Sequence, residues 1–285
     1  MPELPEVETM RRGILSAEGT TVVAARRTRC RKRPLKMKPG WSTIARHLAG
    51  KQLVTVERHG KRLLLGFSSG RWMVIEPRMT GLLLVDGEPG PDHLRFELEL
   101  CGGDCDRIAY WDRRGLGQVY LLDESGLAEY LAPGKIGPDA LTITPQQLQQ
   151  GLEHRSIAVK VGLLDQKAVA GIGNIYASEI LHLCRIDPRV PCRRITRRQW
   201  QTIHGQMLVV LEQAIHMEGS TLSDGTYRTA LNNPGGFQNR HRVYDRAGRT
   251  CDCGGTIRRI VQAQRATFFC GQCQKRRQSD RAITP

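Results

Sequence analysis

Four cysteines near the C-terminal end have the spacing of a metal site. Cys251, Cys253, Cys270 and Cys273 lie within 23 residues and fall into two tight turns. A tetrahedral zinc site made of four thiolates needs two such turns, which a hairpin between them brings together. The second turn has the common Cys-x-x-Cys spacing, whereas the first, Cys-Asp-Cys, is one residue shorter. We predict one structural zinc ion with no open position for water; four unligated thiols are the alternative.

The first residues of the chain could supply a nucleophile. Removal of Met1 would leave Pro2 at the terminus with a secondary amine. An α-amino group titrates near pH ~8, so a useful fraction is neutral at physiological pH. A neutral amine attacks an aldehyde-level carbon and forms an iminium, and the neighbouring Glu3 could transfer protons. The alternative is a simple capped helix, since Pro5 and nearby glutamates favour a helix start.

The charge of the chain indicates a polyanionic partner. The 43 Lys and Arg residues against 28 Asp and Glu residues give a net charge of +15. Eight basic residues fall within the thirteen residues 26–38, and residues 241–285 hold ten Lys or Arg against three Asp. Together with the cysteine hairpin, these runs favour nucleic acid over a membrane surface. An inert basic surface is the alternative.

A glycine-containing turn in the middle of the chain could hold a phosphate. Gly171 and Gly173 precede Asn174 in the segment AGIGNIYASE, and a helix is expected after them. Glycines permit a tight turn, and free N–H groups at a helix N-terminus can bind a phosphate. With the preceding helical segment, the turn forms a helix–turn–helix-like unit suited to clamping a nucleic-acid backbone. Alone, the motif is also compatible with an ordinary helix start.

The elements that must position these residues change type along the chain. Residues 5–15 have the apolar spacing of a helix. From about residue 20 to 122, short apolar segments between Gly, Asp and Pro turns predict an antiparallel sandwich or barrel. The predicted strands lie in residues 51–59, 61–70, 71–77, 81–87, 93–100, 106–112 and 117–123.

The second half of the chain is predicted to be helical. A proline- and glycine-rich segment, residues 131–147, indicates a linker before it. The predicted helices are residues 144–154, 156–166, 174–184 and 196–219. Residues 223–242 are expected to form a mobile loop, and the cysteine-containing end to have short strands.

The sequence has no feature of export or membrane insertion. Its N-terminus is acidic, and no window has the apolar length of a membrane span. We expect an intracellular, cytoplasmic protein with no membrane partner. Its cysteines are then thiols or metal ligands rather than disulfides.

Three motifs occur in a characteristic order. They are PELPEVET at residues 2–9, AGIGNIYASE at residues 170–179 and QRATFFCGQCQ at residues 264–274. In this order and at these distances they resemble the formamidopyrimidine-DNA glycosylase family, over nearly the whole chain. The PELPE start is more similar to the branch that excises oxidised purines than to its endonuclease VIII relatives.

The resemblance implies an α+β fold in three parts. Residues 1–132 would form a catalytic domain with an N-terminal helix and an antiparallel β-sandwich. Residues 133–240 would form a helix-two-turn-helix domain, and residues 241–285 a zinc finger. The partner would be double-stranded DNA with oxidised bases or abasic sites, bound by a monomer in the bacterial cytoplasm.

The resemblance implies catalytic roles for four residues. Pro2 would attack C1′ of the damaged nucleoside, and Glu3 would protonate the ring oxygen of the sugar. Lys61, in ERHGKRLLL, would contact a phosphate and assist catalysis; without the resemblance it would be a surface hairpin lysine. Arg265 would grip the phosphates beside the lesion and assist the second elimination.

Other positions match the family's pocket and its DNA contacts. Glu6 and Glu179 would line the pocket. Lys160 and Asn174 would hold backbone phosphates. Further DNA contacts would come from His93 and Arg155.

A glycosylase must also take its base out of the stack, and the gap that this leaves is costly to maintain. The family fills the gap from two loops, which here supply Met79 from EPRMTG, and Arg114 and Leu116 from WDRRGLG. The second loop departs from the family's D-P-R-R-F-G. Leu116 replaces the stacking phenylalanine, and Gly115 replaces an arginine. An aliphatic side chain can prop the gap but stacks less well on a base.

The resemblance, together with these residues, implies a bifunctional DNA glycosylase and AP lyase that excises oxidised purines, 8-oxoguanine and formamidopyrimidines, in base excision repair. Pro2 would form a Schiff base, and β- and then δ-elimination would cut the strand without a catalytic cofactor. Two alternatives stay open: a pyrimidine-preferring, endonuclease VIII-like enzyme and a non-catalytic lesion-binding protein.

Overall fold

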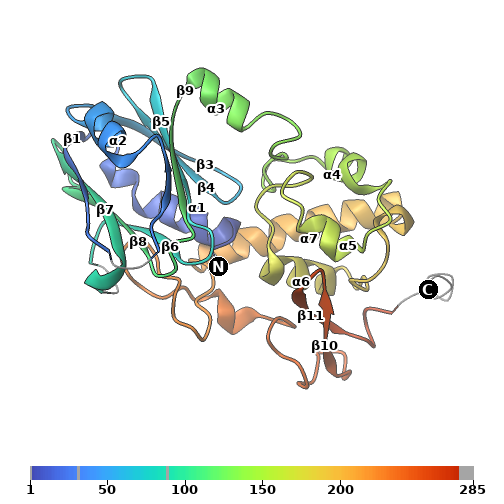
Figure 1. Cartoon of the computed structure of the whole chain (residues 1–285). Coiled ribbons are helices and arrows are strands. Elements are labelled where there is room, and N and C mark those ends of the chain that lie inside the picture. Colours follow the sequence, from blue (N-terminus) through green and yellow to red (C-terminus); the bar gives the residue numbers. More distant parts are fainter. Residues whose placement is uncertain (1, 31–32, 88–89, 276–285) are drawn as a thin grey trace. The chain divides into compact units, whose positions relative to one another are not determined.

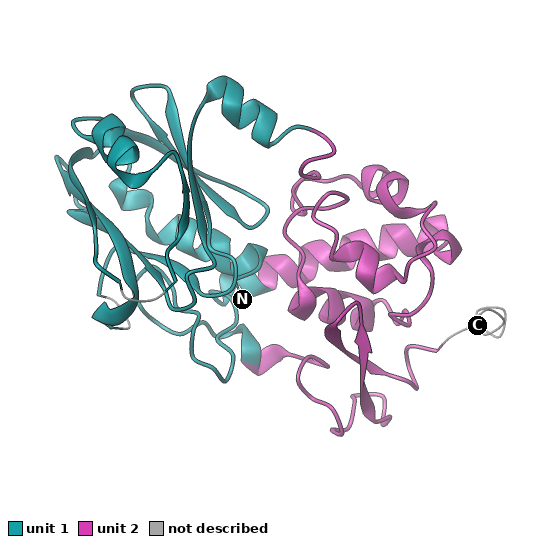
Figure 2. Ribbon diagram, in the orientation of Figure 1, with its two compact units in different colours: residues 1–132, 214–238 teal, residues 133–213, 239–285 magenta. Residues whose placement is uncertain are grey.

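The computed structural model describes residues 2–30, 33–87 and 90–275. The chain divides into two compact units (Figure 2): residues 1–132 with 214–238, and residues 133–213 with 239–285. We call them unit 1 and unit 2. Parts of both basic runs, residues 31–32 and 276–285, lie outside the described residues.

Unit 1 begins with helix α1 (Leu4–Gly13). Pro5 lies in its first turn, and a capping box joins Glu3 and Glu6, so near-neighbour signals explain where the helix starts. Val7 and Met10 of α1 are fully buried in the core of unit 1. The helix predicted here is confirmed, and it begins one residue earlier than expected.

Two sheets form a sandwich in unit 1 (Figure 1). Their strand orders are β1-β7-β8-β6 and β2-β9-β5-β4-β3, with all neighbours antiparallel except β2 and β9. The strands are β1 (Thr21–Arg27), β2 (Lys36–Lys38), β3 (Leu53–His59), β4 (Arg62–Phe67), β5 (Arg71–Glu76), β6 (Gly81–Leu84), β7 (Leu94–Cys101), β8 (Arg107–Asp112) and β9 (Gln118–Asp123). Each predicted strand segment overlaps one of β3 to β9, β1 and β2 had no predicted segment, and the predicted sandwich is confirmed.

Two helices of unit 1 were not predicted. Helix α2 (Trp41–Leu48) lies inside the interval that we expected to contain only strands, and α3 (Glu124–Tyr130) follows β9. Helix α2 has only three buried apolar side chains, too few for their period to separate a helix from a strand. Asp123 caps the N-terminus of α3, and its carboxylate accepts the N–H of Gly126 at 2.9 Å.

The segment of residues 214–238 belongs to unit 1, whereas the sequence division placed it with the helices. The N–H of Val85 donates to the carbonyl of Ala230 at 3.0 Å, which attaches the segment beside β6. Two glycines permit its tight path, because a Cβ at Gly235 would lie 2.5 Å from the carbonyl oxygen of Gly219.

Unit 2 contains helices and one hairpin. Its elements are α4 (Pro145–Leu152), α5 (Val159–Leu163), α6 (Asn174–Leu183), most of α7 (Arg197–His216), β10 (Ile257–Gln262) and β11 (Arg265–Cys270). All four predicted helices are present, although α5 is much shorter than expected.

The chain also contains short 3₁₀ turns in both units. They are η1 (Leu15–Ala17), η2 (Pro91–His93), η3 (Cys192–Arg194) and η4 (Phe237–Arg240). Among the described residues, none of the helices combines the length and the apolar character that crossing a membrane requires.

Candidate active site and metal centre

Pro2 and Glu3 are buried at the start of α1. The N–H of Glu3 donates to Glu6 Oε2 at 2.8 Å, and the Glu3 carboxylate accepts the N–H of Glu6. Glu6 Oε1 also accepts the N–H of Ser220 at 2.8 Å. Gly219 permits this approach, because a Cβ there would lie 2.9 Å from Glu6 Oε1. The Glu6 carboxylate therefore holds the backbone that presents Pro2.

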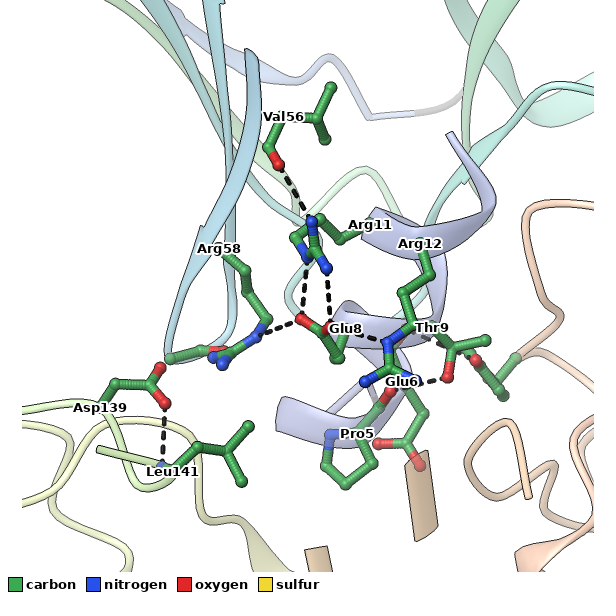
Figure 3. A network of polar contacts seen from close by, with 12 residues as sticks. Pro5, Glu6, Glu8, Thr9, Arg11, Arg12, Val56, Arg58, Asp139 and Leu141 are labelled. Carbon is green, nitrogen blue, oxygen red and sulfur yellow. Dashed lines mark hydrogen bonds and ion pairs between the residues drawn. The ribbon is translucent and has the colours of Figure 1, made fainter. Parts of the chain in front are cut away.

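An ion network surrounds the buried carboxylate of Glu8 on the next turn of α1 (Figure 3). Glu8 Oε1 accepts from Arg11 Nη2 at 3.0 Å and Arg12 Nε at 2.9 Å, and Oε2 accepts from Arg58 Nε at 3.0 Å. Burial by itself would raise the pKa of Glu8. The hydrogen bonds from Arg11 and Arg12 and the nearby positive charges outweigh burial and lower the pKa to about 2. Glu8 is therefore a permanent anion at neutral pH.

Lys61 lies, half-buried, in the turn between β3 and β4. The turn uses Gly60 at φ 57°. Arg58 Nη1 donates to the carbonyl of Gly60 at 2.9 Å while its Nε binds Glu8. One arginine thus joins the turn that carries Lys61 to the helix that follows Pro2. Sequence reasoning missed Glu8 and Arg58, because no local pattern links residues 50 positions apart.

The two loops of residues 76–81 and 111–117, called the wedge loops below, share one buried anchor. Asp112 Oδ1 accepts from Thr80 Oγ1 at 2.5 Å and from the N–H of Arg114 at 3.1 Å. Its Oδ2 accepts the N–H of Gly117 at 2.8 Å. The carboxylate of Asp112 therefore holds both loops in one arrangement.

The wedge side chains themselves lie outside the core. Met79 is 36% exposed, Arg114 is exposed and Leu116 is half-buried. Gly115 has φ 61°, and a Cβ there would lie 2.2 Å from the carbonyl oxygen of Arg33. An arginine at position 115 would not fit this loop conformation. The loop conformation of this chain therefore requires glycine at position 115.

The predicted contact residue His93 ends η2. Its ring meets the ring of Trp111 edge to face, with centroids 5.2 Å apart. This packing ties His93 to β8, the strand that leads into the second wedge loop.

Lys160 is fully buried, which is unusual for a lysine. Its Nζ donates to Asn174 Oδ1 at 2.6 Å, the carbonyl of Ala266 at 3.0 Å and Thr267 Oγ1 at 2.8 Å. These acceptors match the three N–H donors of an ammonium. Asn174 Nδ2 also donates to the carbonyl of Ala266 at 3.0 Å. Both residues fasten the hairpin strand β11 to helices α5 and α6, and their predicted phosphate contacts stay a prediction.

Glu179 also acts within unit 2. Its buried carboxylate accepts the N–H groups of Arg242, Val243 and Tyr244 at 2.8, 3.0 and 2.8 Å. Burial raises the pKa of this carboxyl in spite of those donors. Glu179 therefore holds the chain as it enters the hairpin. That it lines one pocket with Glu6 stays a prediction, since the two residues belong to different units.

The two predicted arginine contacts of unit 2 differ in their surroundings. Arg155 Nη1 pairs with Asp165 Oδ2 at 2.5 Å. Arg265 is exposed and begins β11, directly after a turn in which Ala263 and Gln264 have φ 45° and 61°. Two such residues close a tight hairpin with the strand twist. Arg265 thus stands at the exposed end of a rigid element.

The four predicted cysteine ligands lie together, with their Sγ atoms all within 4.8 Å of one another. Cys251 and Cys273 Sγ are 3.9 Å apart, and Cys253 and Cys270 Sγ are 3.5 Å apart. Zn–S bonds of about 2.3 Å in a tetrahedron place sulfurs about 3.8 Å apart. The donor set therefore fits a structural zinc ion, and the short Cys-Asp-Cys turn still brings both of its sulfurs to the cluster.

Comparison with known proteins assigns all three parts of the chain. Residues 1–119 match the formamidopyrimidine-DNA glycosylase N-terminal domain, residues 136–226 its H2TH domain, and residues 252–276 the zinc finger found in FPG and IleRS. Formamidopyrimidine-DNA glycosylase of Chloroflexus aurantiacus is 40% identical over 280 residues, which cover 96% of this chain and 98% of that protein. The chain belongs to the formamidopyrimidine-DNA glycosylase family.

Solved structures of the family agree with this fold. Lactococcus lactis Fpg bound to DNA with an abasic site has a TM-score of 0.84 at 28% identity, covering 96% of this chain and 100% of that one. A variant of the same protein bound to Fapy-dG-containing DNA has a TM-score of 0.85 at 29% identity, with the same coverage. The predicted α+β fold of β-sandwich, helix-two-turn-helix domain and zinc finger is confirmed, as is the four-cysteine zinc finger of the family.

Proposed function

We propose that this family member is a bifunctional DNA glycosylase and AP lyase, which removes oxidised purines from double-stranded DNA in base excision repair. The observation that carries the proposal is Pro2 at the buried start of α1, held by the paired Glu3 and Glu6. The L. lactis relative binds DNA with abasic sites or Fapy-dG, which supports the same substrate class here.

The proposed chemistry needs a neutral amine on Pro2 after Met1 is removed. The amine attacks C1′, the glycosidic bond breaks and the base leaves with its bonding electrons and a proton. Glu3 protonates the ring oxygen of the sugar, which opens to an iminium between C1′ and the proline nitrogen. Loss of a 2′ proton expels the 3′ phosphate, a second elimination expels the 5′ phosphate, and water releases the enzyme.

The remaining predicted residues act on the DNA rather than on the base. Lys61 and Arg265 bind phosphates beside the lesion, where their charges offset the phosphate that each elimination releases. Arg114, Leu116 and Met79 fill the gap in the stack. We further propose that the protein acts as a monomer inside a bacterial cell, where its DNA substrate lies.

Borohydride trapping tests the proline chemistry. Reduction of the iminium links protein to lesion-bearing DNA. We expect an adduct from protein tagged at its C-terminus, and no adduct when a tag precedes Pro2, because the tag converts the amine into an amide. Proteolytic release of the tag directly before Pro2 should restore trapping. An equal adduct from the N-terminally tagged protein would exclude Pro2 as the nucleophile, and no adduct from any form would favour a non-catalytic lesion binder.

The altered wedge loop makes the pyrimidine-preferring alternative worth testing directly. Excision rates should be compared on duplexes that differ only in carrying 8-oxoguanine or thymine glycol. We expect the oxidised purine to be removed faster. Faster removal of thymine glycol would reject the proposed substrate class while leaving the proline chemistry intact.

A further inference from the structure

His182 is a buried histidine beside the zinc ligands that the family's catalytic chemistry does not use. It lies in α6, is 7% exposed, and its Nε2 is 3.3 Å from Cys251 Sγ. Its other ring nitrogen, Nδ1, is buried and has no hydrogen-bond partner among the described residues. These two environments decide which nitrogen carries the proton.

A neutral imidazole has one N–H donor and one acceptor. A proton on Nδ1 would leave a buried N–H without an acceptor and would aim the Nε2 lone pair at a sulfur that zinc binding makes anionic. A proton on Nε2 avoids both costs, because the N–H then donates to Cys251 Sγ. The geometry therefore favours His182 as a hydrogen-bond donor to that thiolate.

The two cysteine turns differ in length. Cys-Asp-Cys is one residue shorter than the Cys-x-x-Cys turn of Cys270 and Cys273. Hydrogen bonds to ligating atoms orient them and strengthen metal binding. The Nε2 of His182 lies within hydrogen-bond distance of Cys251 Sγ, so His182 stands where it can provide such a bond to the shorter turn.

We propose that His182 donates a hydrogen bond to the Cys251 thiolate and so slows loss of zinc from the finger. Protons and chelators can reach the cysteine ligands, since a pocket of about 240 Å³ is lined by His182, Cys251, Cys253 and Cys273. A ligand sulfur with fewer hydrogen bonds is more easily captured by a proton or a competing chelator from that pocket.

Zinc release from the purified zinc-loaded protein to an excess of a chromophoric chelator tests the proposal. His182→Phe removes the donor but keeps a buried ring, and we expect release about tenfold faster or more, in line with other second-layer partners of metal ligands. His182→Gln keeps an N–H donor and should recover most of the difference. His204→Phe is the matched control, because it removes the His204 Nε2 bond to the Ile143 carbonyl (2.7 Å), which involves none of the four cysteines.

A spectroscopic measurement separates the hydrogen bond from a general loosening of the fold. In cobalt-substituted protein, loss of a donor to a thiolate raises the energy of its lone pairs. The sulfur-to-cobalt charge-transfer band should therefore move to longer wavelength in His182→Phe and stay unchanged in His204→Phe. Unchanged release and an unchanged band in His182→Phe, or the same changes in His204→Phe, would overturn the proposal. Neither readout involves DNA, so the result stands apart from the proposed glycosylase activity.

Discussion

At the scale of single residues, Glu8 shows how one carboxylate can organise the helix that follows Pro2. Its three arginine partners lower its pKa to about 2, against 4.5 for an ordinary glutamate. Because the pKa is lower in the folded state, the ionised carboxylate stabilises the fold above pH 4.5, and this contribution is lost as the pH falls toward about 2.

Replacing this carboxylate should therefore lower the free energy of unfolding by an amount that depends on pH. We expect Glu8→Gln to lower the free energy of unfolding by about 2 kcal/mol at pH 7, because it leaves buried positive charge without its partner. By about pH 3 the difference from the wild type should shrink to roughly half. Urea unfolding at several pH values measures it, with the exposed Glu212→Gln as control. A difference that does not change with pH would show that the charge of Glu8 is not the cause.

Leu116 is the second residue at which a substitution has a predictable effect, here on DNA affinity. Stacking of a base on an aromatic ring contributes about 1–3 kcal/mol. We expect Leu116→Phe to bind a duplex with a stable abasic-site analogue about tenfold more tightly. Fluorescence anisotropy measures the affinity. Val23→Phe adds the same ring at a 57% exposed position on β1 and should change nothing. Equal affinities of Leu116→Phe and wild type would argue against a wedge at this position.

At the scale of elements, small polar links decide how loops and strands are held. Asp112 holds both wedge loops, and Lys160 fastens the finger strand to two helices. Arg58 does the same for the turn that carries Lys61. Each link uses a buried or partly buried charge whose hydrogen bonds are directional, so the geometry of the element depends on it.

Because Arg58 joins Glu8 to the turn that carries Lys61, its replacement should slow excision without weakening DNA binding. Arg58→Lys keeps the charge beside Glu8 but cannot hold Glu8 and the Gly60 carbonyl with one planar group. We expect single-turnover excision to slow about tenfold, since a misplaced catalytic group is costly. Affinity for an uncleavable lesion analogue should stay within about twofold. Arg107→Lys, which alters the Arg107–Glu97 pair at 2.9 Å, is the control. An unchanged excision rate in Arg58→Lys would mean that Lys61 does not depend on this turn.

At the scale of the whole molecule, the dominant quantity is the net charge of +15. Basic residues that neutralise DNA phosphates release condensed counterions, so binding weakens with salt. For about six to ten phosphate contacts, affinity should fall by about 10³–10⁵ between about 50 and 200 mM salt. Titration of undamaged duplex at several salt concentrations gives the slope. A slope near zero would mean that the basic surface is not used for DNA.

Most of the fold could be predicted from the sequence because its signals are local. Pro5 and the paired Glu3 and Glu6 define the start of α1 within four residues, and short apolar segments between Gly, Asp and Pro turns mark the strands. The short helix α2 was missed because eight residues hold too few apolar positions to show a period. The grouping of residues 214–238 with the sandwich was missed because it depends on partners such as Glu6, more than two hundred positions away.

The sequence by itself determined the helix start that presents Pro2, the four cysteine ligands and the family, since each depends on neighbouring residues or motif order. Only the tertiary structure decided which distant side chains hydrogen-bond to these parts of the chain. Arg58 meets Glu8 across 50 positions, His182 meets Cys251 across 69, and Lys160 meets Ala266 across 106. Such polar partners have no periodic pattern, because one hydrogen bond needs only one residue on each side. Their pairing follows from the packing of strands and helices that brings distant positions together.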